Sequence, residues 1–258
     1  MKINVLTLFP EMYSPVTTDS ILGKANEKGL IEINLINIRD FSEDRHRKVD
    51  DTPFGGGCGM LMACQPIFDA MKSIGITDGS KRVLYMSPRG EILSKKLLDS
   101  LVKEDEITIL AGHYEGVDQR VLDYFNMEEV SIGDYVTTGG ELPSMVLIDS
   151  LSRFLPGVLG NAESVEDESV YSGLLEADQY TKPKEYMGLT VPEVLTSGNH
   201  KEIRKFELMN SLEKTAKKRP DLFRKWVKKT KIDDLTEYTK KERKNLSFFI
   251  EKLKEKDR

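Results

Sequence analysis

Three glycine-bearing segments each follow directly on an apolar run that is typical of a β-strand. They are residues 87–90 (SPRG), 112–116 (GHYEG) and 131–143 (SIGDYVTTGGELP). In open α/β sheets small ligands bind beyond the carboxyl ends of parallel strands, where glycine lets the backbone approach the ligand closely. The sequence therefore predicts a small-molecule site at which three strand ends converge.

The first 160 residues alternate between strand-like and helix-like patterns. Strands are expected over residues 3–8, 31–38, 82–86, 106–111 and 129–132, and helices over 65–73, 94–103, 119–124 and 144–154. This alternation predicts βαβ units, and hence an α/β fold with a mostly parallel sheet. The pattern fails over residues 160–188, which are expected to be a linker.

Helical periodicity returns in the last 60 residues. Helices are expected over 199–218, 221–229 and 236–256, with Asn199 and Glu202 spaced as an N-terminal capping box. Residues 199–258 carry 20 Lys and Arg against 11 Asp and Glu, although the whole chain has a net charge of −5. A basic tail on an acidic chain favours a nucleic-acid partner, with a solvated helical surface as the alternative.

Several common activities have no signature here. A dinucleotide-binding glycine motif, a phosphate-binding P-loop, a nucleophile elbow and a zinc-protease helix are all missing. The two cysteines and three histidines lack the spacing of a zinc site, so no metal site is predicted. No apolar run reaches the roughly 18 to 20 residues of a membrane span, and we expect a cytoplasmic protein with reduced thiols.

Residues 44–57 combine basic side chains, acids, an aromatic ring and a run of glycines. Such a loop can hold an RNA backbone while Phe54 or His46 stacks on an unpaired base. The alternative is an ordinary mobile surface loop.

Together these motifs resemble one family, the bacterial tRNA (guanine-N1)-methyltransferases of the SPOUT class. The matching segments are residues 8–12, 39–41, 44–47, 50–57, 59–62, 112–120, 131–136, 139–143, 152–154, 156–160, 180–183 and 197–200. So many ordered matches make the resemblance specific.

The resemblance implies a fold that composition alone does not indicate. It implies a parallel sheet whose carboxyl-end loops form a deep trefoil knot, followed by a small, all-helical C-terminal domain. The expected domains are a knotted methyltransferase domain (1–160), a linker that carries a catalytic carboxylate (161–188) and a basic tRNA-binding domain (189–258). It also implies a homodimer with its active site at the subunit interface.

The family's chemistry is the transfer of a methyl group from S-adenosylmethionine to N1 of the guanosine 3′ of the anticodon, position 37 of tRNA. The family also suggests Mg²⁺, for which no site can be recognised. By family position the expected cofactor contacts are Tyr85, Met86, Ser87, Gly112, Tyr114, Glu115, Ile132, Gly133, Asp134, Tyr135, Val136, Thr137, Gly139, Gly140 and Pro143. Thr137 replaces the leucine usual in the family, a change that a backbone contact tolerates. The expected RNA contacts are Arg45, His46, Arg47, Asp50, Phe54, Ser197, Asn199 and His200.

The transfer needs a base for the N1 proton and a group that stabilises charge on guanine O6. By family position the O6 group is Arg153, whose alternative role is a helix-capping surface arginine. The family's Glu-Asp-Ser linker motif corresponds to Asp167-Glu168-Ser169 here, so the register from both sides makes Glu168 the base. A one-residue slip would present Asp167 instead, and a third alternative is that both are solvated linker acids.

Two rival functions remain at this point. A non-catalytic RNA-binding protein explains the charge distribution but gives Glu115 and Arg153 no role. Another SPOUT methyltransferase, acting on a ribose 2′-OH or a different base, would keep the cofactor site and change the rest.

Overall fold

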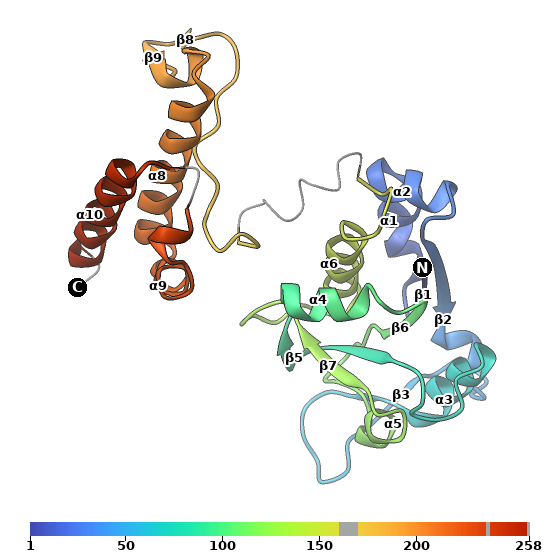
Figure 1. Cartoon of the computed structure of the whole chain (residues 1–258). Helices are drawn as coiled ribbons and strands as arrows, with labels where there is room; N and C mark the ends of the chain where they lie inside the picture. The colour runs from blue at the N-terminus through green and yellow to red at the C-terminus, as the bar shows by residue number, and fades with distance from the viewer. Residues whose placement is uncertain (160–169, 236–237, 257–258) are drawn as a thin grey trace. The chain divides into compact units, whose positions relative to one another are not determined.

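The computed structural model describes residues 1–159, 170–235 and 238–256. The chain divides into two compact units, Met1–Ala162 and Glu163–Arg258 (Figure 1). The division falls at the start of the segment that the sequence marks as a linker.

A five-stranded sheet forms the centre of the first unit. Its strands are β1 (Lys2–Thr7), β2 (Glu32–Asn37), β5 (Val83–Ile92), β6 (Glu106–Leu110) and β7 (Glu128–Ser131). They lie in the order β2-β1-β6-β5-β7, and every neighbouring pair is parallel. The predicted α/β fold with a parallel sheet is confirmed.

Helices cover both faces of this sheet (Figure 1). One face packs against α3 (Cys64–Ser73) and α5 (Gln119–Tyr124), and the other against α4 (Lys95–Leu101) and α6 (Glu141–Ser152). Successive strand residues alternate between the two cores, because side chains in a strand point to opposite faces. In β5, for example, Tyr85 joins the core under α3 and α5, whereas Leu84 joins the core under α4 and α6.

The segment after β1 is helical, which the sequence did not indicate. It forms a 3₁₀ turn η1 (Pro10–Tyr13), α1 (Ser14–Thr18) and α2 (Ser20–Glu27). The glycine within α2 has a packing reason, because a Cβ on Gly23 would lie 2.3 Å from the carbonyl carbon of Thr18. A 3₁₀ turn η2 (Ile38–Phe41) follows β2, and the short strands β3 (Asp50–Asp51) and β4 (Leu61–Met62) pair antiparallel.

Strand β5 is longer than expected. It passes Met86 and continues to Ile92, with a shift of register against β7 between Met86 and Glu91. Gly90 permits this continuation, because a Cβ there would lie 2.3 Å from the carbonyl carbon of Glu129. Residues 87–90 are therefore an irregular part of the strand and not a free loop.

Among its described residues, the second unit contains three helices, α8 (His200–Lys218), α9 (Pro220–Lys229) and α10 (Lys240–Lys256). Their shared core includes Leu212, Phe223 and Ile250. A small hairpin, β8 (Glu185–Tyr186) and β9 (Leu189–Thr190), precedes the 3₁₀ turn η3 (Glu193–Thr196), and η4 (Ile232–Asp234) joins α9 to α10. Asn199 caps α8 as predicted, since its side chain accepts from the backbone N–H of Glu202. None of the helices that the structure describes is long and apolar enough to cross a bilayer.

Candidate functional site

A pocket of about 180 Å³ lies at the carboxyl ends of β6 and β7 and beside residues 85–88 of β5, where the register against β7 shifts. Of the fifteen residues expected to bind a cofactor, all but Gly133 and Asp134 line it: Tyr85, Met86, Ser87, Gly112, Tyr114, Glu115, Ile132, Tyr135, Val136, Thr137, Gly139, Gly140 and Pro143. Gly133 and Asp134 belong to the loop that forms one wall. The three glycine-bearing segments singled out in the sequence therefore do meet at one place.

Glycines give this pocket its tight walls. A Cβ on Gly140 would lie 2.7 Å from the backbone nitrogen of Gly112, and a Cβ on Gly112 would lie 2.6 Å from the ring of Tyr85. The backbone N–H of Gly140 donates to the carbonyl oxygen of Gly112 over 2.7 Å. Burial raises the pKa of Tyr85, so its hydroxyl stays protonated beside these two turns.

The loop 131–140 is held by its own side chains. The Tyr135 hydroxyl donates to the carbonyl oxygen of Ile132, and the Thr137 hydroxyl donates to that of Gly139 over 2.8 Å. The backbone N–H groups of residues 136–138 make no hydrogen bond to any residue that the structure describes. These N–H groups can donate hydrogen bonds to the ring nitrogens of a purine. They therefore fit a nucleoside-containing cofactor.

The pocket is small for a ligand site. Typical ligand sites measure roughly 300–1,000 Å³, against about 180 Å³ here. The pocket is therefore smaller than a typical ligand site.

The turn 112–116 is hydrogen-bonded to residues 60–62, which follow the loop of basic and aromatic residues at 44–57. The N–H of Glu115 donates to the carbonyl oxygen of Met60 over 3.0 Å, and the N–H of Met62 donates to that of Gly116 over 2.9 Å. Gly59 lies against the Glu115 side chain so closely that a Cβ would be 2.3 Å from its Cγ. The loop that ends there carries Phe54, which is 100% exposed. Its position leaves the ring free to stack on a ligand outside the chain.

The other predicted RNA contacts lie in two places. In the first unit, Arg45, His46 and Arg47 are exposed, and Arg47 pairs with Asp40 over 3.1 Å. Asp50 begins β3, which pairs with β4. In the second unit, Ser197, Asn199 and His200 are exposed at the start of α8.

Arg153 does not line the pocket of its own chain. It is the C-terminal capping residue of α6, whereas Gly140 caps the other end of the same helix. A helix of 12 residues is about 18 Å long. The two linker acids, Asp167 and Glu168, lie outside the described residues.

Two residues beside the pocket were missed by the sequence analysis. His113 lines the pocket between two predicted residues, and Glu141 is buried at the first position of α6. The one signal for Glu141 was its place in the matching segment 139–143.

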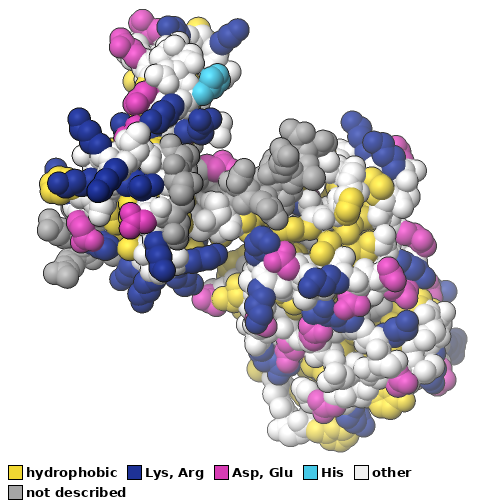
Figure 2. Space-filling view, viewed as in Figure 1, with side chains coloured by type: hydrophobic (Ala, Val, Ile, Leu, Met, Phe, Trp, Pro, Cys, Tyr) yellow, Lys and Arg dark blue, Asp and Glu magenta, His cyan; other side chains and the backbone are white. Residues whose placement is uncertain are grey.

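The second unit presents a basic surface. Lys and Arg side chains gather over α8, α9 and α10 (Figure 2). On α9 alone, Arg224, Lys225, Lys228 and Lys229 are all exposed. This concentration suits a polyanion.

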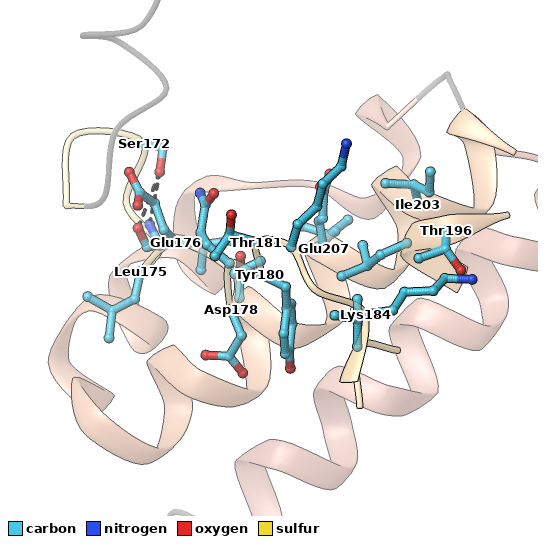
Figure 3. A pocket seen from close by; sticks show the side chains of 18 residues that line it. Ser172, Leu175, Glu176, Asp178, Tyr180, Thr181, Lys184, Thr196, Ile203 and Glu207 are labelled. Atoms are coloured by element: carbon cyan, nitrogen blue, oxygen red, sulfur yellow. Dashed lines mark hydrogen bonds between the residues drawn. The ribbon is translucent and has the colours of Figure 1, made fainter. Parts of the chain in front are cut away.

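A larger cavity, of about 1050 Å³, lies within the second unit (Figure 3). The segment 172–184 forms one side of it, and residues of α8 such as Ile203 and Glu207 form another. None of the residues predicted to bind cofactor or RNA lines it. Its lining mixes carboxylates, lysines and leucines, and does not select a ligand class.

Among the residues that the structure describes, no group of three His, Cys, Asp or Glu side chains could hold a metal ion. The family's Mg²⁺ therefore stays a prediction from resemblance. Cys58 and Cys64 are not joined to each other.

Comparison with known proteins gives consistent matches over most of the chain. A family model described as tRNA (Guanine-1)-methyltransferase TrmD matches residues 1–225. A tRNA (guanine-N(1)-)-methyltransferase of Ruminiclostridium cellulolyticum is 53% identical over 226 residues, which are 87% of this chain and 97% of the relative. Enzymes of the same name are 48% identical in Endomicrobium trichonymphae, over 87% of this chain and 100% of the relative, and 50% identical in Clostridium perfringens, over 90% and 97%.

Proposed function

The chain belongs to the tRNA (guanine-1)-methyltransferase family, and from that premise we propose that it methylates N1 of the guanosine 3′ of the anticodon, position 37, in tRNA. The methyl donor is S-adenosylmethionine. The observation that carries the proposal is the glycine-walled pocket at the ends of two parallel strands and the register shift of a third, in a chain whose relatives bear this activity by name. The enzyme acts in the cytoplasm, where its substrate is.

The pocket supplies the cofactor contacts. The free N–H groups of residues 136–138 read the purine edge, and Gly112 and Gly140 let the backbone lie against the ligand. Glu115 accepts hydrogen bonds from amino or hydroxyl groups. The cofactor's contribution is a methyl group activated by a sulfonium charge.

The chain's own residues hold the guanine and move its proton. The methyl group passes from sulfur to N1 as the S–CH₃ bond breaks and the N–CH₃ bond forms. Glu168, or Asp167 if the register slips by one, takes the N1 proton. Arg153 donates to O6 and stabilises the negative charge that develops there.

The geometry of α6 supports a site shared by two copies of the chain. Leu142, Val146, Asp149 and Arg153 are spaced along one face of this helix, and Leu142 and Val146 are 54% and 45% exposed. An exposed apolar helix face is typical of an interface. Two copies related by a two-fold axis across this face run their α6 helices antiparallel. Arg153 of each copy then lies beside the pocket of the other copy. Within one chain, the length of α6 keeps Arg153 away from the pocket.

The trefoil knot belongs to the same proposal. The contact between Gly140 and the backbone of residues 111–112 supports it, because the chain after β7 returns tightly against the turn after β6. The turns brought together there are the ones that would hold the cofactor.

The tRNA is held by both units. Arg45, His46, Arg47 and Phe54 contact the anticodon loop, with Asp50 at the stem of their loop, and residues 189–258 supply phosphate contacts. Ser197, Asn199 and His200 add polar contacts at the start of α8, and the linker 161–188 brings its carboxylate to the base.

The test is methylation of a tRNA transcript with guanosine at position 37, followed by mass spectrometry of the nucleosides. We expect N1-methylguanosine at that position and none in a transcript with adenosine there. A ribose methylation would identify another SPOUT activity. Failure to bind S-adenosylmethionine in calorimetry would support a pure RNA-binding protein.

A further inference from the structure

Glu141 is a buried carboxylate that the proposed chemistry does not use. It is 2% exposed, at the first position of α6. Its Oε1 accepts a hydrogen bond from the Thr7 hydroxyl over 2.9 Å, and that hydroxyl in turn accepts from the backbone N–H of Phe9. One carboxylate oxygen is thus fixed to the end of β1.

The other oxygen faces a buried ring nitrogen that lacks a hydrogen bond within the described part of the chain. Oε2 of Glu141 lies 3.8 Å from Nδ1 of His113, and this buried nitrogen has no hydrogen-bond partner among the described residues. A buried carboxylate and a buried imidazole nitrogen each destabilise the fold unless they are paired. The rings of Phe9 and Tyr114, each with its centre 5.2 Å from that of His113, pack edge-on and restrict the imidazole.

Gly139 leaves the line between the two groups open. A Cβ there would lie 2.5 Å from Oε2 of Glu141 and 2.5 Å from Nδ1 of His113. Any side chain at this position would separate the carboxylate from the imidazole. Both His113 and Gly139 line the cofactor pocket, on different walls.

We propose that Glu141 is a positioning residue that sets the width of the cofactor pocket through the facing imidazole of His113. The carboxylate is anchored to β1 by Thr7, and the pair draws the turn 112–116 towards the start of α6. A separation of 3.8 Å exceeds a hydrogen bond, so the pair has room to close when the cofactor bridges the two walls. The inference rests on the proposed function, since it names S-adenosylmethionine as the ligand.

A double-mutant cycle on the full chain tests this coupling, with S-adenosylmethionine binding measured by calorimetry. We expect Glu141→Gln, which keeps the shape and removes the charge, to weaken binding about 10-fold, and His113→Asn to weaken it similarly. In the His113→Asn background, Glu141→Gln should add less than about 3-fold. In steady-state kinetics the KM for the cofactor should rise about 10-fold in Glu141→Gln, with kcat within about 3-fold.

A matched control separates positioning from general stability. Ser152→Ala removes a buried hydroxyl of the same helix, which donates to the Ile148 carbonyl over 2.7 Å at the end away from the pocket. It should lower the melting temperature and leave cofactor binding unchanged. If Glu141→Gln does not fold, Glu141→Asp withdraws the charge by one methylene, and the same loss of coupling is expected.

The inference would be overturned if the double mutant lost affinity by the product of the two single-mutant losses. It would also be overturned if Ser152→Ala lost as much affinity as Glu141→Gln. Both results leave the proposed function intact, because the unaltered protein still binds the cofactor. If the unaltered protein itself fails to bind S-adenosylmethionine, the proposed function fails and the inference falls with it.

Discussion

The backbone N–H of Gly140 donates to the carbonyl oxygen of Gly112 over 2.7 Å, and this bond joins the loop after β7 to the turn after β6. A Cβ on Gly140 would meet three backbone atoms of residues 111–112 at 2.7 to 2.9 Å. Backbone on both sides cannot yield as the tip of a side chain can. The contact therefore fixes the wall of the pocket at a position where only glycine fits.

Gly140→Ala should abolish cofactor binding. The extra methyl group forces the two turns apart, at a cost of about 1–3 kcal/mol in stability. Calorimetry with S-adenosylmethionine measures the loss, and thermal unfolding confirms that the variant folds. Gly75→Ala is the matched control: its φ of +79° strains an alanine, but its methyl group meets no described atom within 4 Å. Unchanged binding in Gly140→Ala would show that the ligand does not depend on this wall.

The turnover rates of two variants distinguish which linker carboxylate, Glu168 or Asp167, is the general base. Glu168→Gln should lose about 10²-fold or more in kcat, because a general base is removed, while cofactor affinity is kept. Asp167→Asn should lose much less. Single-turnover methylation of a tRNA transcript gives both rates. The reverse ranking indicates a register slipped by one residue, and no loss in either variant excludes a linker base.

Much of the first unit could be predicted from the sequence, because its strands are buried on both faces and so appear as continuous apolar runs. The helices α1 and α2 could not, because α1 is only five residues long and Gly23 lowers the helix propensity of α2. Gly23 is there because the Thr18 backbone leaves no space for a side chain, a tertiary contact that no local pattern contains. The continuation of β5 through Pro88 and Gly90 was hidden for the same reason.

Part of the candidate site could likewise be predicted from the sequence, and part of it could not. Glycine turns after apolar strands predicted the pocket, since that geometry follows from the fold class. The link from Glu141 to Thr7 joins residues 134 positions apart and has no sequence signature. Arg153 was assigned by its place in the family's motif, and the proposal that a second chain uses it rests on the length of α6.

Subunit complementation tests the shared site. Gly140→Ala lacks a working pocket but keeps Arg153, and Arg153→Ala keeps the pocket. If Arg153 serves the pocket of its partner, mixed dimers of the two inactive variants contain one site with both features. We expect up to about a quarter of the activity per chain after statistical exchange of equal amounts. Mass spectrometry of differently tagged chains verifies the exchange, and mixed dimers without any activity would contradict a site shared in this way.

The amino end of α10 makes the second unit sensitive to acid. Glu242 accepts hydrogen bonds from the N–H and hydroxyl of Thr239, each over 2.7 Å, and pairs with Lys201. These hydrogen bonds lower the pKa of Glu242 from 4.5 to about 2. A carboxyl with a lowered pKa in the folded state stabilises it above pH 4.5, and this stabilisation is lost as the pH falls towards 2.

Glu242→Gln should therefore flatten the loss of stability between pH 4.5 and 2. Trp226, the one tryptophan of the chain, packs on the core of the second unit and reports its unfolding in urea by fluorescence. Glu251→Gln on the same helix, where the carboxylate contacts only Lys254 among the described residues, makes the same change of charge as a control. An equal pH dependence in Glu242→Gln and the unaltered protein would argue against the assignment.

The exposed lysines of α9 should set much of the salt dependence of tRNA binding. Each lysine that neutralises a phosphate releases counterions, so the slope of log K against log salt changes by about 0.9 for duplex and about 0.7 for single-stranded contacts. Lys225→Gln, Lys228→Gln and Lys229→Gln combined should weaken binding at low salt and reduce the slope by roughly these amounts for each lysine in contact with phosphate. Lys28→Gln, Lys96→Gln and Lys103→Gln remove three exposed charges from the first unit and should leave the slope nearly unchanged. Filter binding of tRNA between 50 and 200 mM salt measures both sets. Equal slopes in the two triple variants would mean that tRNA responds to net charge alone, and that the basic face of the second unit does not contact its phosphates.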